Sequence, residues 1–219
     1  MPLLRGELNR LRVVGRPWVV RRYLRRHADR KLHLGCGRVI VPGWLNADKF
    51  APQADIYLDA YHRLPFPDGV FDCVYMEHLI EHIRIERVPR FLAELARVLR
   101  PGGVLRLTCP DLELFARMYC EDRAEFFEPI LERFAKARAR RPQLNWLVRT
   151  KGGAWNTRAV QRFYHHRWFY DFETLAACLS EVGLRDVRRQ EFGVSVRAEA
   201  GRLDSPQRRA ESLYLDAIR

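Results

Sequence analysis

The chain has 219 residues, which is long enough for one domain with a substantial hydrophobic core. A hydrophobic fraction of 47% with 12 Phe, 8 Tyr and 5 Trp excludes a disordered chain, and no apolar stretch approaches the length of a membrane-spanning helix. The formal net charge of +12 favours an anionic partner, such as a phosphorylated substrate, an acidic membrane surface or RNA.

Cysteine usage and the N-terminal sequence indicate the compartment. The chain has five cysteines, an odd number, and no two of them form a CxxC pair. This pattern excludes a disulfide framework and a cysteine-based zinc site, and it is typical of a reducing compartment. Arginine interrupts the N-terminal sequence every few residues, so no signal-peptide core is predicted. We therefore expect a cytoplasmic protein, with peripheral contact at the inner face of the membrane left open.

The positive charge is concentrated in two segments. Residues 1–31 hold ten Arg and Lys against two acidic residues, and residues 121–170 hold eleven against five. A GC-rich genome would also produce many arginines, but codon bias should load the whole chain equally. The placement therefore predicts two basic patches, which are an N-terminal arm over residues 1–30 and an internal segment.

In chain order, predicted helices alternate with predicted strands. Helices are expected at 16–30, from 77, at 86–99, over most of 111–165 and at 172–183. Strands are expected at 31–34, 44–48, 54–60, 70–76, 104–108, 184–192 and 212–218. Such alternation implies a mostly parallel sheet that is covered by helices.

Two glycines and two carboxylates follow the first three predicted strands. The first strand ends in Gly35-Cys36-Gly37, the second in Asp48 and the third in Asp59. Parallel sheets bind ligands at the carboxyl ends of their strands. There, glycine removes the Cβ that would block a ligand, and a carboxylate accepts hydrogen bonds from a ribose diol or an adenine amine. Ordinary turns and surface acids are the alternative, but three strand ends in series favour a binding site.

Several further segments carry a family resemblance. They are LHLGCG (32–37), GWLNAD (43–48), LPFPDGVFDCVYMEHLIEH (64–82), LRPGGVLRLTCPDLE (99–113), HRWFYDFETL (166–175) and SLYLDAI (212–218). In these segments the chain resembles the class I S-adenosylmethionine (SAM) methyltransferases, specifically their small type 11-like branch. The resemblance implies a Rossmann-like α/β fold, in which a seven-stranded, mostly parallel sheet has helices on both faces and an antiparallel last strand. It also implies SAM as the cofactor.

The resemblance implies cofactor contacts at seven positions. They are Gly35, Cys36 and Gly37 against the methionine part, Asp48 at the ribose hydroxyls, Asp59 and Ala60 beside the adenine, and Glu77 near the reactive end. One departure is His33, where many relatives carry an acid. Another is the spacing, because only ten residues separate Gly37 from Asp48, whereas a dinucleotide fingerprint needs about twenty and a third glycine. This short crossover argues against NAD.

Histidines and acids beyond the glycine loop are candidates for a catalytic base. His78 and His82 are four residues apart with Glu81 on the same helical face, His166 lies in a matched motif, and Asp111 follows the fifth strand. We select His82, His166 and Asp111 as catalytic candidates. Helix capping and packing are the alternative for these side chains, and the His-x-x-Glu-His face could also hold a divalent metal with a later histidine. We assign no metal.

The segment at about 112–165 is the predicted helical lid over the acceptor, because the cofactor fold uses the rest of the domain. Aromatic and arginine side chains alternate late in this segment and just after it, which indicates either core packing or a wall that stacks on a sugar or a base. The fourth strand is followed by EHLIEH rather than by an Asn/Asp-Pro-Pro-aromatic sequence. This argues against methylation of DNA or of adenine N6.

Together these features predict a SAM-dependent methyltransferase domain at 31–219 behind the basic arm at 1–30. The expected acceptor is a small molecule or a glycan, phosphorylated ones included. A hydroxyl is favoured because the resembling family accompanies polysaccharide and cell-envelope chemistry. An RNA methyltransferase and an inactive scaffold of the same fold are the alternatives, and the intact Gly35, Gly37 and Asp48 argue against the scaffold. The acceptor atom, the metal dependence and the oligomeric state are left open.

Overall fold

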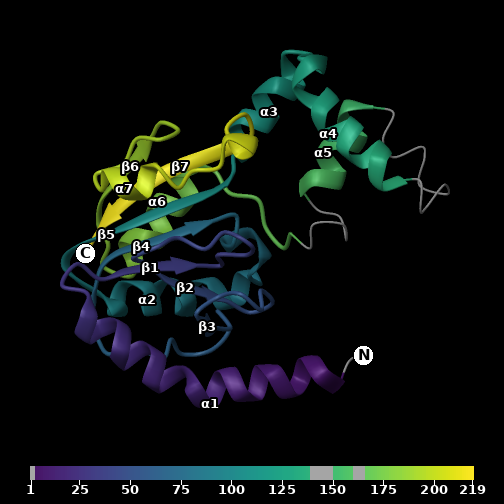
Figure 1. Cartoon of the computed structure of the whole chain (residues 1–219). Helices are drawn as coiled ribbons and strands as arrows, with labels where there is room; N and C mark the ends of the chain where they lie inside the picture. The colour runs from purple at the N-terminus through teal and green to yellow at the C-terminus, as the bar shows by residue number, and fades with distance from the viewer. Residues whose placement is uncertain (1–2, 139–149, 160–165) are drawn as a thin grey trace.

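The computed structural model describes residues 3–138, 150–159 and 166–219, which form one seven-stranded sheet with helices around it (Figure 1). The strands are β1 (Lys31–Leu34), β2 (Leu45–Asp48), β3 (Ile56–Tyr57), β4 (Phe71–Glu77), β5 (Leu99–Pro110), β6 (Arg185–Gln190) and β7 (Ser212–Ile218). The helices are α1 (Leu3–Arg26), α2 (Val88–Val98), α3 (Leu112–Cys120), α4 (Ala124–Arg138), α5 (Lys151–Ala159), α6 (Phe172–Glu181) and α7 (Ala198–Gly201). Short 3₁₀ turns lie at Ile80–His82, Ile85–Arg87 and Pro206–Arg208.

The strand order is β3-β2-β1-β4-β5-β7-β6. β1 pairs in parallel with both β2 and β4, and β7 runs antiparallel between β5 and β6. The order reverses at β1 and β4, which places the switch point where ligands bind in such sheets. The predicted fold class, a mostly parallel Rossmann-like sheet with an antiparallel last strand, is confirmed.

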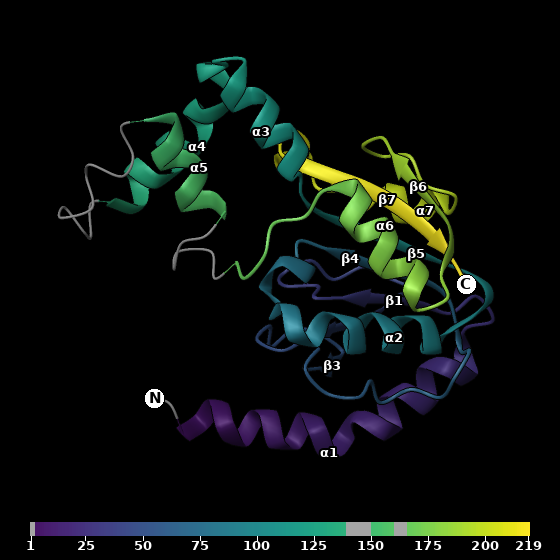
Figure 2. The same ribbon diagram turned by 180° about the vertical axis from the view of Figure 1, so that it is seen from behind.

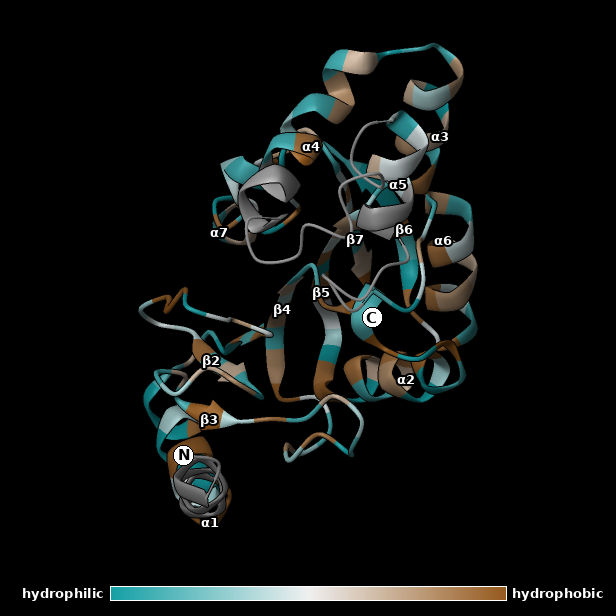
Figure 3. Ribbon diagram, turned by 90° about the vertical axis from the view of Figure 1, so that its right-hand side faces the viewer, coloured by the Kyte–Doolittle hydropathy of each residue, from teal (hydrophilic) through white to brown (hydrophobic). Residues whose placement is uncertain are grey.

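The core lies between the sheet and helices α2 and α6. Helices α2 and α6 lie side by side on one face (Figure 2). The apolar residues of α2 recur at helical spacing, and Phe91, Leu92 and Leu95 are buried. The other face carries a smaller cluster, in which Trp44 and Tyr75 pack with Ala200 of α7. Brown apolar positions accordingly follow the strands and the inner side of α2 (Figure 3).

Several predicted elements differ in length from those of the structure. The third strand shrinks from the expected 54–60 to two residues, and the fifth grows from 104–108 to Leu99–Pro110. The segment EHLIEH forms only a 3₁₀ turn instead of a helix start. Strand pairing with the antiparallel β7 extends β5 as far as Pro110, and this pairing is invisible in a local hydrophobic pattern.

Helix α1 begins well before the predicted residue 16 and ends at Arg26. Its last turns pack on the domain, where Val20 and Tyr23 are buried. The Tyr23 hydroxyl donates to the main-chain oxygens of Lys31 and Gly43, at 2.8 and 3.1 Å. The apolar side of the basic arm is therefore part of the core. Among the described helices, none is both long and apolar enough to cross a bilayer.

Helices α3, α4 and α5 form a separate unit beyond the carboxyl end of β5 (Figure 1). They have their own small core of Phe115, Phe127, Ile130 and Ala154. The segment predicted as a helical lid contains this unit, and its role as a lid stays a prediction. Two parts of it, 139–149 and 160–165, lie outside the described residues, and with them the aromatic pair Phe163 and Tyr164.

Candidate active site

The glycine loop after β1 has the backbone conformation that glycine alone adopts easily. Gly35 and Gly37 have φ values of 71° and 53°. The amides of Gly35 and Cys36 both donate to Ala47 O on β2, at 2.8 and 3.2 Å, so the loop turns back across the neighbouring strand. A Cβ on Gly35 would lie 3.2 Å from the Leu79 side chain, whereas one on Gly37 would meet nothing within 4 Å. The open side of Gly37 leaves its backbone accessible.

Asp48 fixes the glycine loop from the end of β2. Its Oδ2 accepts the Gly37 amide at 3.0 Å, and its Oδ1 accepts the amides of Phe50 and Ala51 at 2.5 and 2.7 Å. A carboxylate has about four acceptor sites, and three are used here, so about one remains for a hydrogen bond from a ribose hydroxyl. Asp48 thus joins the turn after β2 to the loop after β1.

A cavity of about 570 Å³ lies in front of these strand ends, within the size range of pockets for small ligands. Of the seven predicted cofactor residues, four line it, namely Gly35, Asp48, Asp59 and Ala60. The remaining lining residues are Leu34, Lys49, Phe50, Leu58, Tyr61, His78, Leu79, His82, Ile83 and Arg167. Apolar walls with carboxylates at one end suit a nucleoside attached to an aliphatic chain.

Asp59 lies at the rim of this cavity in a defined ion pair. Lys49 Nζ is 2.8 Å from its Oδ2, and the Tyr61 amide donates to its Oδ1 at 3.1 Å. Burial raises the pKa of Asp59, but Lys49 and these hydrogen bonds outweigh it and lower the pKa below its usual value. Asp59 is therefore an ionised acceptor at neutral pH.

Two of the predicted cofactor residues have other partners. Glu77 accepts the amide and the hydroxyl of Ser205, at 2.9 and 2.5 Å, and so holds the loop before β7. Cys36 is buried against Ala51 and Ala54. Neither these two nor Gly37 is among the cavity-lining residues, and the cofactor contacts of all three stay predictions. The sequence analysis missed Phe50, Tyr61, Leu79 and Arg167; an aromatic residue two positions after the strand-end acid is the signal that could have found Phe50.

The EHLIEH segment places a buried carboxylate next to three imidazoles. Glu81 is fully buried, and its Oε1 is 3.1 Å from His78 Nδ1 and 3.9 Å from His166 Nε2. The rings of His82 and His166 meet edge to face with centroids 4.9 Å apart. Burial raises the pKa of Glu81, but the facing His78, His82 and His166 bring it down to about 2. The side chain is therefore ionised at any pH above that value.

His166 reaches this cluster from a distant segment. The amide of Arg167 donates to the main-chain oxygen of Glu81 at 2.6 Å. Further along, the Leu112 amide donates to Tyr170 O at 2.8 Å. These bonds fasten residues 166–170 across the ends of β4 and β5. The structure thus brings together two of the three predicted catalytic residues, His82 and His166.

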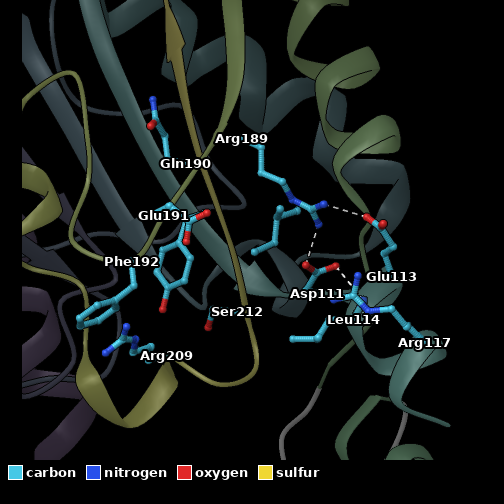
Figure 4. Close-up of a pocket in the computed structure, with 12 residues that line it drawn as sticks. Asp111, Glu113, Leu114, Arg117, Arg189, Gln190, Glu191, Phe192, Arg209 and Ser212 are labelled. Atoms are coloured by element: carbon cyan, nitrogen blue, oxygen red, sulfur yellow. Dashed lines mark hydrogen bonds and ion pairs between the residues drawn. The ribbon is translucent and has the colours of Figure 1, made fainter. Parts of the chain in front are cut away.

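Asp111, the third predicted catalytic residue, lies in a different cavity (Figure 4). It caps α3 by accepting the Leu114 amide at 3.2 Å, and its Oδ2 is 2.7 Å from Arg189 of β6. The same arginine pairs with Glu113 at 2.9 Å. This second cavity has a volume of about 300 Å³ and does not include the histidine cluster. A catalytic role for Asp111 stays a prediction, and its observed contacts are those of a helix cap.

Part of the chain is similar to known methyltransferases. A family model described as a methyltransferase domain matches residues 40–107. Demethylmenaquinone methyltransferase of Mycobacterium tuberculosis is 34% identical over 101 residues, which are 45% of this chain and 41% of that protein. A ubiquinone/menaquinone biosynthesis C-methyltransferase of Teredinibacter turnerae is 32% identical over 94 residues, or 42% of this chain and 34% of that protein. The chain spans less than half the length of these curated relatives.

Among solved structures, a SAM-dependent methyltransferase from Archaeoglobus fulgidus has a similar fold, with a TM-score of 0.50 at 16% identity over 98% of this chain and 96% of that one. The resemblance to the type 11 branch is therefore confirmed over residues 40–107, which match the methyltransferase domain model, and the chain as a whole has a fold similar to that of a SAM-dependent methyltransferase. The predicted enzyme class and the predicted cofactor, S-adenosyl-L-methionine, agree with this family.

Proposed function

We propose that this chain transfers a methyl group from SAM to a hydroxyl of a small or glycan-type acceptor. The cavity of about 570 Å³ is the observation that carries the proposal. Gly35, Asp48 and His82 all line this one cavity. The first two suit the cofactor, and an imidazole suits removal of a hydroxyl proton. Basic patches also support an RNA acceptor, but the described cavity contains only Lys49 and Arg167 as cationic side chains.

The cofactor supplies a sulfonium methyl group that is already activated for transfer. The chain has to bind and orient the two reactants and accept one proton. Asp48 would bind the ribose and the glycine loop would lie against the methionine part, while Leu79 and Ile83 provide apolar contact that excludes water. The methyl carbon would leave the sulfonium sulfur for the acceptor oxygen, which yields S-adenosylhomocysteine. His82 would receive the hydroxyl proton, and the ionised Glu81 would stabilise the resulting imidazolium. Holding the reactants in line supplies most of the rate.

A test of the acceptor uses radiolabelled SAM and a panel of nucleotide sugars, reducing glycans and hydroquinones. Methylation of a sugar hydroxyl is the expected result. Methylation of a hydroquinone ring carbon would replace the hydroxyl proposal by a carbon acceptor, which is the second candidate because the curated relatives are named as quinone-pathway methyltransferases. Methylation of RNA in the same assay would contradict both.

Asp48→Ala should weaken binding of S-adenosylhomocysteine by about ten-fold to over a hundred-fold. A hydrogen bond to a charged group contributes roughly 1.5–3 kcal/mol, and the substitution also frees the Gly37 amide that Asp48 accepts. Isothermal titration calorimetry measures the change. The Asp48→Asn variant keeps the shape of the side chain and separates loss of charge from loss of the turn. Glu181→Ala, at the exposed end of α6, is the matched control and should bind normally. No heat from well-folded wild type would contradict the proposed cofactor.

The exposed side of α1 should dock the protein on an acidic membrane surface. Val14 and Trp18 are 78% and 62% exposed, and the Arg22 guanidinium lies 5.2 Å from the Trp18 ring centroid. Exposed Arg21, Arg25 and Arg26 continue this face. Aromatic and apolar side chains flanked by arginine favour an anionic headgroup layer. We expect salt-sensitive co-sedimentation with phosphatidylglycerol vesicles.

The double variant Trp18→Ala with Arg22→Ala should lose this sedimentation while its melting temperature stays unchanged, because neither side chain is buried. Arg188→Ala, an exposed cation on β6, is the control for net charge. Deleting residues 1–26 should instead lower the melting temperature, since it removes the buried Val20 and Tyr23. If the full-length protein stays in the supernatant at low salt, the docking proposal is wrong.

A further inference from the structure

Three side chains that commonly bind metal ions meet beside the cofactor cavity. One ligand atom from each of Glu81, His82 and His166 lies within 4.8 Å of the other two. Glu81 and His82 come from the turn after β4, and His166 comes from the segment before α6. The Arg167 amide bonded to Glu81 O at 2.6 Å holds the two segments together. The cluster is therefore assembled by the tertiary fold and not by a single helix face.

The carboxylate of Glu81 is short of hydrogen bonds for a group so deeply buried. It has no exposed surface, its Oε2 has no hydrogen-bond partner among the described residues, and the nearest cationic atom to its Oε1 is His78 Nδ1 at 3.1 Å. Burying a carboxylate with so few partners costs several kcal/mol, and buried charges are normally paired or coordinate a metal. A carboxylate in this position, with imidazoles beside it, suits a bound cation.

The nearby histidines leave this charge only partly compensated. His78 Nδ1 approaches Oε1 at 3.1 Å, but His166 Nε2 is 3.9 Å away, beyond hydrogen-bond distance. A zinc ion bound at about 2.1 Å holds tetrahedral ligand atoms about 3.4 Å apart. Small rotations of the side chains would bring the three ligand atoms from 4.8 Å or less to this separation.

We infer that Glu81, His82 and His166 form a site for one divalent transition-metal ion of the Zn²⁺ type. Two imidazoles with one carboxylate are a typical ligand set for such an ion, and catalytic sites leave its fourth position open. His82 also lines the cofactor cavity, so an ion held by it would lie close to the reactants. The site itself stands without the proposed function. Its role rests on that function and would replace free His82 as the proton acceptor: the ion would bind the acceptor oxygen and favour loss of its proton to water.

His78 contacts the Glu81 carboxylate and would fix its orientation as a metal ligand. Its Nδ1 is the ring atom near Glu81 Oε1, and its Nε2 is 2.7 Å from Ser212 Oγ at the start of β7. The backbone of His78 has a φ of 49°, in the left-handed region that non-glycine residues rarely adopt. Hydrogen-bonded partners behind metal ligands typically change affinity by about 10–100-fold when removed. His78→Gln should weaken metal binding by that factor without abolishing it.

The test uses the full chain without a histidine tag, stripped with a chelator and kept free of SAM. Titration with Co²⁺ should give the visible absorption of a tetrahedral ion at a stoichiometry of one, and calorimetry with Zn²⁺ should give the same stoichiometry. Glu81→Gln and His166→Gln should each weaken Zn²⁺ binding at least about 100-fold, since they remove a ligand. His62→Gln, an imidazole that is 80% exposed, is the matched control and should bind normally.

Each outcome decides the proposal. Absence of stoichiometric binding by wild type overturns it, and so does normal binding by Glu81→Gln or His166→Gln. A thiolate charge-transfer band with Co²⁺ would place the ion on a cysteine and overturn it as well. Where Glu81→Gln does not fold, the half-buried His82→Gln replaces it as the ligand variant. Binding of S-adenosylhomocysteine by the metal-free protein is measured separately, so failure of the metal site and failure of the methyltransferase proposal are distinguishable.

Discussion

Replacing Arg106 by methionine should lower the free energy of unfolding by about 3–5 kcal/mol, because it leaves buried carboxylates without a partner. Arg106 is the largest fully buried side chain. Its guanidinium lies 2.5 Å from Asp204 and 3.5 Å from Asp216, and it donates to Glu191 O at 3.2 Å. It therefore joins β5 to β7 and to the loop after β6. Urea denaturation followed by circular dichroism measures the loss.

The free energy of unfolding of the same variant, measured as the pH is lowered, provides a second readout. Burial raises the pKa of Asp204 above its usual value, although Arg106 opposes this. Without the arginine, that pKa rises further. A carboxyl with a raised pKa in the folded state stabilises the fold when protonated and destabilises it when ionised. The deficit of Arg106→Met should therefore be largest near neutral pH and shrink as the pH falls.

Two further variants control this experiment. Arg188→Met removes an exposed arginine from β6 and should change stability by less than about 0.5 kcal/mol. Adding Asp204→Asn to Arg106→Met should recover part of the loss, since it removes one of the two uncompensated charges. An Arg106→Met protein as stable as wild type would show that the buried network contributes nothing.

Much of the fold could be predicted because its signals are local. The period of α2, the glycine pair after β1 and the acids at strand ends are each visible in a few consecutive residues. The extension of β5 to Pro110 could not be predicted, since it depends on antiparallel pairing with residues 212–218. The role of the arm was open for the same reason: Tyr23 is buried by contacts with Lys31 and Gly43 that no helical pattern contains.

In the candidate site, too, the positions with local signals could be predicted and those that depend on distant partners could not. Gly35, Asp48, Asp59 and Ala60 line one cavity, because a motif fixes a residue at a strand end. Their contacts with the cofactor stay a prediction. Glu77 was equally close to a strand end, but its carboxylate accepts from Ser205 in a loop 128 residues later. The carboxylate of Asp111 likewise accepts a hydrogen bond from Arg189, which is distant in the sequence. Side-chain direction at these positions depends on distant partners, which a single sequence does not reveal.

His82→Gln and His166→Gln should each lower turnover by about 10²–10⁴-fold, the usual contribution of a positioned proton acceptor. The motivating geometry is their edge-to-face contact at 4.9 Å, with the ionised Glu81 beside both. Affinity for S-adenosylhomocysteine should stay within about a few-fold of wild type, because the cofactor contacts proposed for Gly35 and Asp48 do not involve these rings. Formation of S-adenosylhomocysteine with the acceptor found in the panel gives kcat, and calorimetry gives the affinity.

A comparison of the two variants shows whether each histidine acts as a proton acceptor or as a metal ligand. Excess Zn²⁺ that restores part of the turnover of both would show that each histidine acts by holding the ion. A loss in His82→Gln that no metal restores would identify His82 as the proton acceptor. The exposed His62→Gln should keep full turnover throughout. Unchanged turnover in both cluster variants would leave the two histidines with a purely structural role at the junction of the turn after β4 and the segment before α6.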